Sequence, residues 1–352
     1  MKKSNKVLKC IIFLLLGIFI FQVISYIFVP KWIDPIDPAT ARLKEYYNEK
    51  PNTIDVIFVG NSETSRGYSP ITVWQKYGIT SYNYGSSFQT TQIAYYKLKE
   101  CLKYQNPKII LLETNSFFEI ASTEESYRKV LNNLKLDNVT LNAILDKNVD
   151  LDNRLSYVLP LLRFHSRWNQ LETNDFKISL EKEFQTVQYK GMPVIVKKSA
   201  YNGDRDYMRE KGKKEKIPEK NLNYIEKIVK CCEDKKIKLV MVEIPTPNVW
   251  SLAKNKAIIE LANNYGIDFI DFNLMQNQIG LDWSNDTYDA GGHMNVYGAE
   301  KVSSYIGQVL SEKYNLEDHR NNKEIADDWN ETARRYEERK LELEKSIINN
   351  KK

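Results

Sequence analysis

Apolar residues gather in one long run and several short ones. The long run, residues 10–29, has twenty positions without a charged side chain, which is enough for a helix to cross the core of a bilayer. Short runs rich in β-branched residues predict buried strands. Five of them lie at residues 54–59, 79–85, 108–114, 238–245 and 267–273.

Helical spacing of apolar residues follows the later strands. It predicts amphipathic helices over residues 225–232, 258–265 and 302–310. Strands that alternate with helices predict an α/β fold, in which helices cover both faces of a parallel sheet and ligands bind at the carboxyl ends of the strands. Periodicity is weak over residues 120–217, and we interpret this stretch as a large insertion that caps the site or binds a partner.

The composition excludes several classes of protein. With 352 residues, 42% of them hydrophobic, the chain has the apolar content that a disordered protein lacks. Its mean hydropathy of −0.51 is too low for a transporter with many spans. The four cysteines predict neither a disulfide framework nor a metal site. What remains is one large globular domain or two small ones.

Positive charge is concentrated before the long apolar run. Lys2, Lys3, Lys6 and Lys9 supply four of the five excess charges, so the rest of the chain is nearly balanced, which argues against nucleic acid as the main partner. By the positive-inside rule, the N-terminus lies in the cytoplasm and the body of the chain outside the membrane. A cleaved signal peptide is the alternative. Because the apolar stretch is longer than usual and no A-x-A site follows it before Pro30, we favour a retained single-pass anchor in the cell membrane.

These patterns divide the chain into five parts. They are a cytoplasmic N-terminus at 1–9, a transmembrane helix at 10–29, a juxtamembrane linker at 30–53, an α/β domain at 54–312 that includes the insertion, and a charged C-terminal helix or tail at 313–352. For the last part we favour a solvated helix or frayed end over a partner-binding helix, because runs of charge usually mark solvated faces.

The first predicted strand ends in the sequence Gly60-Asn61-Ser62-Glu63. A glycine-led turn at the end of a strand exposes a serine hydroxyl beside the start of a helix, as a nucleophilic serine requires. The alternative is structural, since Asn61 and Ser62 are also good helix N-caps.

Only three histidines are available as a general base for such a serine. His293 lies in the loop before the last predicted helix, four residues after Asp289 and seven after Asp286, whereas His319 lies in the charged tail. A carboxylate that holds an imidazole in one tautomer lets the other ring nitrogen take the serine proton. The alternative is a turn rich in aspartate and glycine that happens to contain a histidine.

The third histidine, His165, lies in the predicted insertion beside Arg163, Arg167 and Trp168. This group has the chemistry to contact an anionic acceptor. We favour a surface or packing role for His165 and leave it out of the catalytic set.

Two further residues lie at the carboxyl ends of the second and third predicted strands. Gly85 allows close approach to a backbone N–H, and Asn115 offers a side-chain amide. Donors of this kind stabilise the charge that develops on a carbonyl oxygen under attack. Each residue alone is common at the end of a strand. The four motifs together, in chain order at successive strand ends, indicate a site for acyl chemistry.

This order of motifs resembles the SGNH (GDSL-like) hydrolase superfamily over residues 54–312. The resemblance implies a three-layer α/β/α sandwich on a five-stranded parallel sheet, here preceded by one N-terminal transmembrane helix. It implies neither a cofactor nor a metal. The residues to which it assigns roles are Ser62 as nucleophile, the N–H of Ser62 with Gly85 and Asn115 as oxyanion-hole donors, His293 as base and Asp289 as its carboxylate.

The chain departs from the family pattern in three of its blocks. Asn61 replaces the usual aspartate of the first block, and Glu113-Thr114-Asn115-Ser116 replaces G-x-N-D in the third. The family also places an aspartate three residues before the histidine, where this chain has Ala290. Asp286 therefore remains the alternative acid.

The single span, the G-N-S-E-T-S-R opening and the late H-M-N-x-Y-G-A segment further resemble the DltD-like branch of this superfamily. Its members modify polysaccharides beside multi-span MBOAT acyltransferases. The resemblance implies an extracytoplasmic serine acyltransferase that moves an acetyl or D-alanyl group onto a cell-envelope or exported glycopolymer through an acyl-Ser62 intermediate. Two alternatives stay open: an esterase or deacetylase that removes acyl groups from such a polymer, and a non-catalytic anchored scaffold.

Overall fold

The computed structural model describes residues 2–29, 39–119, 124–131, 133–176, 189–209 and 214–349. Part of the predicted juxtamembrane linker, residues 30–38, and parts of the predicted insertion lie outside these ranges. The chain forms two units. One consists of Met1–Asp34 and Thr140–Gln185, and the larger one of Pro35–Val139 and Thr186–Lys352.

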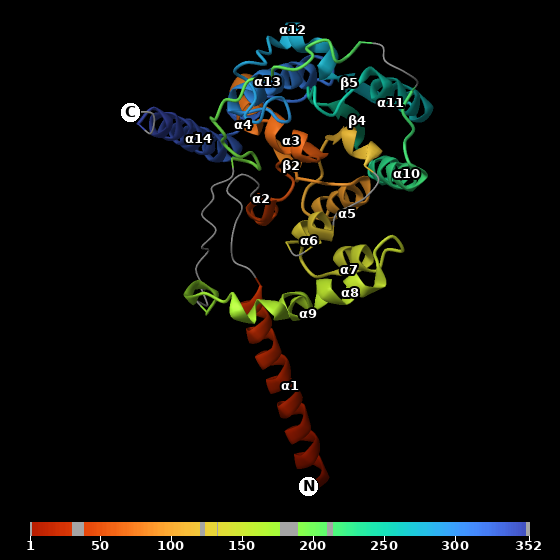
Figure 1. The fold of residues 1–352 in the computed structure, drawn as a ribbon, viewed down its shortest axis with the longest axis vertical. Coiled ribbons are helices and arrows are strands. Elements are labelled where there is room, and N and C mark those ends of the chain that lie inside the picture. The colour runs from red at the N-terminus through yellow and green to blue at the C-terminus, as the bar shows by residue number, and fades with distance from the viewer. Residues whose placement is uncertain are drawn as a thin grey trace. The chain divides into compact units, whose positions relative to one another are not determined.

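A five-stranded parallel sheet, in the order β2-β1-β3-β4-β5, is the centre of the larger unit (Figure 1). Its strands are β1 Val56–Gly60, β2 Ser81–Gly85, β3 Ile109–Glu113, β4 Lys238–Glu243 and β5 Asp268–Asp271. All residues of β1 and β3 are buried, and this explains why their sequences are continuous apolar runs rather than alternating ones. The predicted parallel sheet and its five strands are confirmed.

Helices cover both faces of this sheet (Figure 1). On one side α5 (Thr91–Cys101) packs against α10 (Glu219–Asp234), and on the other α4 (Pro70–Tyr77) packs against α13 (Val296–Glu312). The further elements of this unit are α2 Ala39–Tyr46, α3 Ser62–Gly67, α6 Glu124–Leu131, α11 Leu252–Tyr265, α12 Gln276–Ile279, and the 3₁₀ helices η1 Asn115–Phe118, η4 Phe272–Met275 and η5 His319–Asn321.

The second half of the predicted linker packs against the sheet. It contains α2, whose Tyr46 is buried with its ring 5.0 Å from that of Tyr82 and 4.7 Å from that of Tyr84. Both of those tyrosines belong to β2. Burial of three aromatic rings in one cluster ties α2 to the edge of the sheet.

The C-terminal helix α14 (Lys323–Asn349) differs from the solvated tail that its charges favour. Trp329 is buried, and its ring lies 5.3 Å from that of Trp74 on α4. Tyr336 is also buried, and its hydroxyl donates a 2.8 Å hydrogen bond to Glu300 on α13. The helix is therefore solvated on one face and packed on the other, because a few apolar residues recur at helical spacing among its charges.

The smaller unit combines the N-terminal helix with the middle of the predicted insertion. In α1 (Lys2–Phe28), the segment Lys6–Phe28 is long and apolar enough to cross a membrane, although a signal sequence near the N-terminus passes the same test. α1 packs against α9 and the two 3₁₀ helices that follow it. The elements of the insertion in this unit are α7 Asn138–Ile144, which begins at the boundary, α8 Leu151–Val158, α9 Pro160–Phe164, η2 His165–Asn169 and η3 Thr173–Phe176.

Candidate active site

The turn between β1 and α3 holds Ser62 at the carboxyl edge of the sheet. Gly60 ends β1 where a Cβ would lie 2.0 Å from Thr64 Oγ1, so a larger residue does not fit. Asn61 caps α3, because its side-chain oxygen accepts a 3.0 Å hydrogen bond from the N–H of Glu63. Ser62 is the first residue of α3 and is only half-buried. The capping role thus falls to Asn61 and leaves the serine hydroxyl at the surface of the turn.

Asp289 and His293 form a close pair in the loop before α13. Asp289 Oδ2 lies 2.5 Å from His293 Nδ1, and Asp289 Oδ1 accepts a 2.7 Å hydrogen bond from the N–H of His293. Burial alone would raise the pKa of Asp289, but the hydrogen bonds and charge of His293 hold that pKa below its usual value. An ionised Asp289 fixes the proton on Nδ1 and leaves Nε2 as the acceptor.

The alternative acid, Asp286, has a different partner. Its carboxylate is almost fully buried and accepts a 2.7 Å hydrogen bond from Lys301 Nζ and another 2.7 Å bond from the N–H of Asp282. The structure therefore pairs Asp289, and not Asp286, with His293. The four-residue spacing suffices because the chain turns back at Ala290 (φ 60°) and Gly291 (φ 92°), which lets one carboxylate contact both the ring and the backbone of His293.

Ser62 and His293 are not hydrogen-bonded to each other. The Ser62 hydroxyl donates to Glu63 Oε2 at 3.2 Å. The two elements are nevertheless neighbours: α3 packs against α13, and the guanidinium of Arg66 on α3 lies 6.0 Å from the centre of the Tyr288 ring, which itself stacks on His293.

Asn115 is positioned by a lysine that sequence reasoning did not identify. Lys254 Nζ on α11 donates a 2.9 Å hydrogen bond to Asn115 Oδ1. The lysine is itself fixed by a 2.7 Å bond to the carbonyl of Val249. With its oxygen engaged, the Asn115 amide presents its NH₂ group, which donates no hydrogen bond to the described residues. Nothing in the local sequence marks Lys254, since it lies 139 residues from Asn115.

Gly85 is placed differently from Asn115. Its N–H donates a 3.1 Å hydrogen bond to the side-chain oxygen of Asn83, so this donor is already engaged. A Cβ at Gly85 would lie 2.5 Å from the backbone nitrogen of Ser65 on α3. The glycine therefore permits close packing of α3 on β2. Further along the same loop, Phe88 is exposed and has a φ of 56°, which is unusual for a bulky residue.

A row of buried carboxyl groups lies behind the serine turn, and the sequence did not indicate it. Glu113 and Glu243 end β3 and β4, and both are fully buried, as is nearly all of Glu63. Burial raises the pKa of all three groups, to about 8 for Glu113; the charge of Glu63 also raises the pKa of Glu113, and both of these groups raise the pKa of Glu243. Thr114 Oγ1 donates a 2.6 Å hydrogen bond to Glu243. In the sequence, Glu113 and Glu243 are recognisable only as residues near the ends of predicted strands, and not as members of one buried group.

The other two histidines have partners outside this site. His319 Nε2 lies 2.8 Å from Asp55 Oδ2. His165 is exposed in the smaller unit, where its Nδ1 lies 2.8 Å from the carbonyl of Leu162. In the part of the chain that the structure describes, no group of three or more His, Cys, Asp or Glu side chains is placed to hold a metal ion.

Comparison with known proteins gives distant structural likenesses only. No family model and no curated protein matches this chain. Its fold is similar to a protein described as lipolytic, of the G-D-S-L family, from Desulfitobacterium hafniense DCB-2, with 14% identity and a TM-score of 0.36 over 72% of this chain and 98% of that one. It is also similar to a protein described as an acylhydrolase from Bacteroides fragilis NCTC 9343, with 12% identity and a TM-score of 0.37 over 77% and 95% of the two chains. Identities and TM-scores this low do not assign the chain to a family.

Proposed function

We propose that this chain is a membrane-anchored serine acyltransferase of SGNH type, which moves an acetyl or D-alanyl group onto a glycopolymer of the cell envelope. The observation that carries the proposal is the pair of Asp289 and His293, joined at 2.5 Å in a loop beside the helix that begins with Ser62. The sequence resemblance to the DltD-like branch supports the acceptor class.

In the first half-reaction, the Ser62 hydroxyl turns from Glu63 toward His293 and attacks the carbonyl carbon of the acyl donor. His293 Nε2 takes the hydroxyl proton, while the carboxylate of Asp289 stabilises the resulting imidazolium. The tetrahedral intermediate then collapses, the leaving group takes the proton from His293, and Ser62 is left acylated.

In the second half-reaction, His293 removes a proton from a hydroxyl group of the glycopolymer, which attacks the acyl-serine. The ester bond to Ser62 breaks and the serine recovers its proton from His293. If water takes the place of the polymer, the same residues hydrolyse the ester. An esterase or deacetylase is therefore the second candidate, and the acceptor decides between the two.

Two groups suit the stabilisation of the oxyanion in both steps. They are the N–H of Ser62, at the N-terminus of α3, and the side-chain amide that Lys254 orients on Asn115. The N–H of Gly85, the third donor that the family resemblance implies, would first have to leave the oxygen of Asn83.

The membrane part of the proposal rests on the N-terminal helix. Its apolar stretch follows several lysines, and this pattern supports a retained single-pass anchor with a cytoplasmic N-terminus and an extracytoplasmic site. A multi-span MBOAT-type protein is the proposed partner that supplies the acyl group.

The test combines labelling of the serine with the acyl content of the polymer. In full-length protein, we expect a fluorophosphonate probe to label the native chain and to fail on Ser62→Ala, with His293→Ala reduced by about 10³-fold or more. Ser65→Ala, which removes a fully buried hydroxyl on the same helix, is the matched control and should label normally.

In cells, loss of the gene should lower the acyl content of the envelope polymer, and Ser62→Ala should not restore it. A rise in acyl content would identify a deacetylase instead. Full restoration by Ser62→Ala would contradict both enzymatic proposals and favour a scaffold.

A further inference from the structure

The smaller unit exposes an unusual number of apolar side chains outside its N-terminal helix. Among the described residues beyond α1, eight of the fifteen exposed large hydrophobic residues lie between positions 141 and 176. Six of them, which we call the apolar face, are Leu151, Leu155, Val158, Leu162, Trp168 and Phe176, with 44–73% of each residue exposed. An exposed apolar patch of this kind marks a surface that contacts another protein, a membrane or a ligand.

The apolar face follows helical spacing rather than chance. Its members at positions 151, 155 and 158 are separated by four and three residues, so they form one stripe along α8, and Leu162 lies in α9, beyond the non-helical residue Leu159 (φ −119°, ψ 81°). In an ordinary globular domain such a stripe faces the core. Here its residues are exposed.

The segment that carries this face is fixed to the C-terminal end of α1. Arg167 Nη1 donates a 2.5 Å hydrogen bond to the carbonyl of Phe28, and Arg167 Nη2 pairs with Asp175 at 3.1 Å. These bonds link η2 and η3 to the last turn of the apolar helix. In Figure 1, α8 and α9 run crosswise to α1 at that end.

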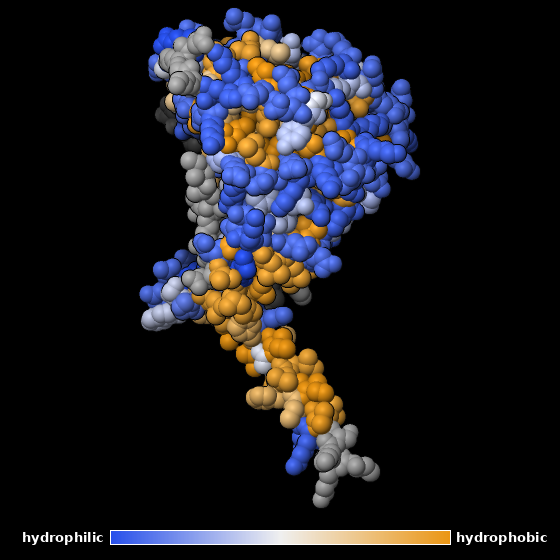
Figure 2. All heavy atoms as spheres, turned by 90° about the vertical axis from the view of Figure 1, so that its right-hand side faces the viewer, coloured by the Kyte–Doolittle hydropathy of each residue, from blue (hydrophilic) through white to orange (hydrophobic). Residues whose placement is uncertain are grey.

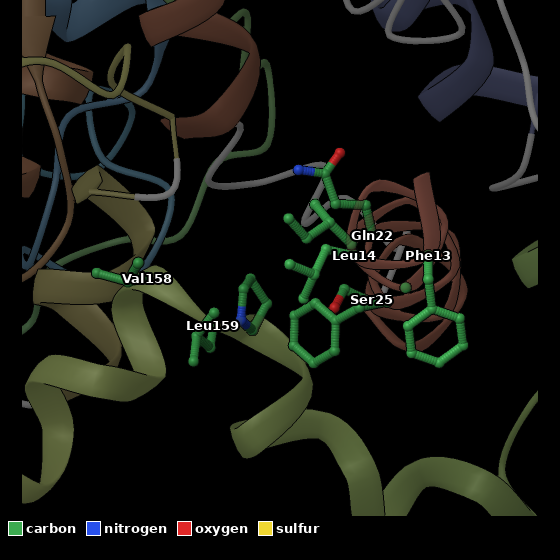
Figure 3. Close-up of a pocket in the computed structure, with 10 residues that line it drawn as sticks. Phe13, Leu14, Gln22, Ser25, Val158 and Leu159 are labelled. Atoms are coloured by element: carbon green, nitrogen blue, oxygen red, sulfur yellow. The ribbon is translucent and has the colours of Figure 1, made fainter. Parts of the chain in front are cut away.

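An open apolar groove of about 690 Å³ separates α1 from the turn between α8 and α9. Leu14 and Ser25 of α1 lie toward Leu159 on the other wall (Figure 3). In Figure 2 the hydrophobic surface of α1 runs upward into a wider hydrophobic area at the level where α9 meets α1 in Figure 1. The apolar face is thus continuous with the surface of the helix that is apolar enough to cross a membrane.

We propose that the apolar face lies in the outer leaflet of the membrane that α1 crosses, so that α8 and α9 form an amphipathic element in the plane of the interface. Lipid is favoured over a protein partner because the face continues the surface of α1, and because it includes the largely exposed Trp168 and has Arg163 next to Leu162 in the chain. Basic and aromatic residues are typical of the headgroup level. Flexible acyl chains also fit an open groove between helices. This inference rests on the proposed retention of α1 in the bilayer, but not on the acyl chemistry.

The test measures the depth of single residues in the full-length protein, reconstituted in lipid nanodiscs. The four native cysteines are replaced by serine, and one new cysteine is labelled with an environment-sensitive fluorophore in Leu155→Cys or, independently, Leu162→Cys. Leu341→Cys is the matched control, because Leu341 is a similarly exposed leucine on α14 in the other unit. Phe19→Cys, within α1, reports on the anchor itself.

We expect probes at residues 155 and 162 to show blue-shifted emission, to lose fluorescence when the nanodiscs contain doxyl-labelled lipid, and to resist iodide in the water. The probe at residue 341 should show the opposite response. Quenching of the 155 and 162 probes by iodide would overturn the inference. Protection from both quenchers would also overturn it, because a protein would then cover the face. If either of these results is found while lipid quenches the probe at residue 19, α1 lies in the membrane and only the assignment of the apolar face is wrong. If the probe at residue 19 is exposed to water, both the anchor and the inference are wrong.

Discussion

Asp289 contacts the backbone and the side chain of the same histidine. One carboxylate oxygen accepts from the N–H of His293 and the other lies against the ring nitrogen Nδ1. The backbone bond fixes the turn, and the side-chain bond fixes the tautomer. A single residue thus fixes both the position and the tautomer of the candidate base.

This arrangement predicts different outcomes for the two aspartates of the loop. Asp289→Asn should lower the rate of fluorophosphonate labelling by about 10²–10⁴-fold, because an amide does not stabilise the imidazolium or hold its tautomer. Asp286→Asn should label within about threefold of the native rate, since Asp286 pairs with Lys301 and does not contact His293. The measurement is the labelling rate of both variants under the same conditions.

The stability of the two variants provides the control. Asp286→Asn should be the less stable of the pair, by about 1–2 kcal/mol relative to the native chain, because it weakens a hydrogen-bonded ion pair whose carboxylate is buried. If Asp286→Asn lost labelling and Asp289→Asn kept it, the assignment of the acid would be reversed.

At this scale the sequence predicts the ends of strands better than the contacts between distant residues. Ser62, His293 and Asp289 follow from local motifs, because a turn, a scarce residue type and a short spacing are all visible in the sequence. Lys254 does not, because its contact with Asn115 exists only after β3 and α11 have been brought together. The hydrogen bond that engages the Gly85 N–H depends in the same way on the rotamer of Asn83.

Among the elements, the carboxyl ends of the central strands concentrate buried carboxyl groups. Glu113 and Glu243 lie in neighbouring strands, and Glu63 follows β1 in α3. Burial and mutual repulsion favour the protonated form of these groups. Stability should therefore depend on pH through protons that the folded chain keeps and the unfolded chain releases.

For Glu113, the folded pKa of about 8 lies above the ordinary value of 4.5. Between these values the folded state binds more protons than the unfolded state, so its stability should fall as the pH rises from about 4.5 to 8. Glu113→Gln removes this contribution. We expect the variant to lose less stability than the native chain between pH 5 and pH 8, by on the order of 2–5 kcal/mol. Thermal unfolding of the detergent-solubilised full-length protein at several pH values measures this, and parallel curves for the two proteins would contradict it.

The C-terminal helix offers a second prediction among the elements. Trp329→Ala should lower the free energy of unfolding by about 3 kcal/mol, because the side chain is buried against Trp74 and a cavity would remain. Leu341→Ala, at an exposed position of the same helix, should change it by about 0.5 kcal/mol or less. Equal effects would mean that α14 does not pack on α4 in solution.

The same helix shows where patterns of charge mislead. Charged residues dominate α14, so a solvated helix or tail is the natural expectation from its sequence. Its buried stripe is narrow and depends on Trp74 and the helix α13, which are far away in the chain. The strands, in contrast, can be predicted from the sequence without knowledge of the residues that pack on them, since a fully buried strand is apolar at nearly every position.

For the whole molecule, the predicted insertion proves to be divided. Its central part, Thr140–Gln185, groups with the N-terminal helix, whereas the residues on either side group with the sheet. Weak periodicity marked this stretch as unusual without showing the division. Sequence patterns assign a helix to a domain by the apolar face that it turns toward the core. The apolar residues of α8 and α9 are exposed instead, so the sequence does not indicate the unit to which these helices belong.

The bond between Arg167 and Phe28 also sets an order of events during synthesis. The acceptor on α1 leaves the ribosome 139 residues before its donor does. If α1 is the retained anchor that we propose, it enters the membrane on its own hydropathy, before its packing against η2 can form. The segment that follows much later then meets a helix that is already inserted, so the smaller unit is assembled on the membrane.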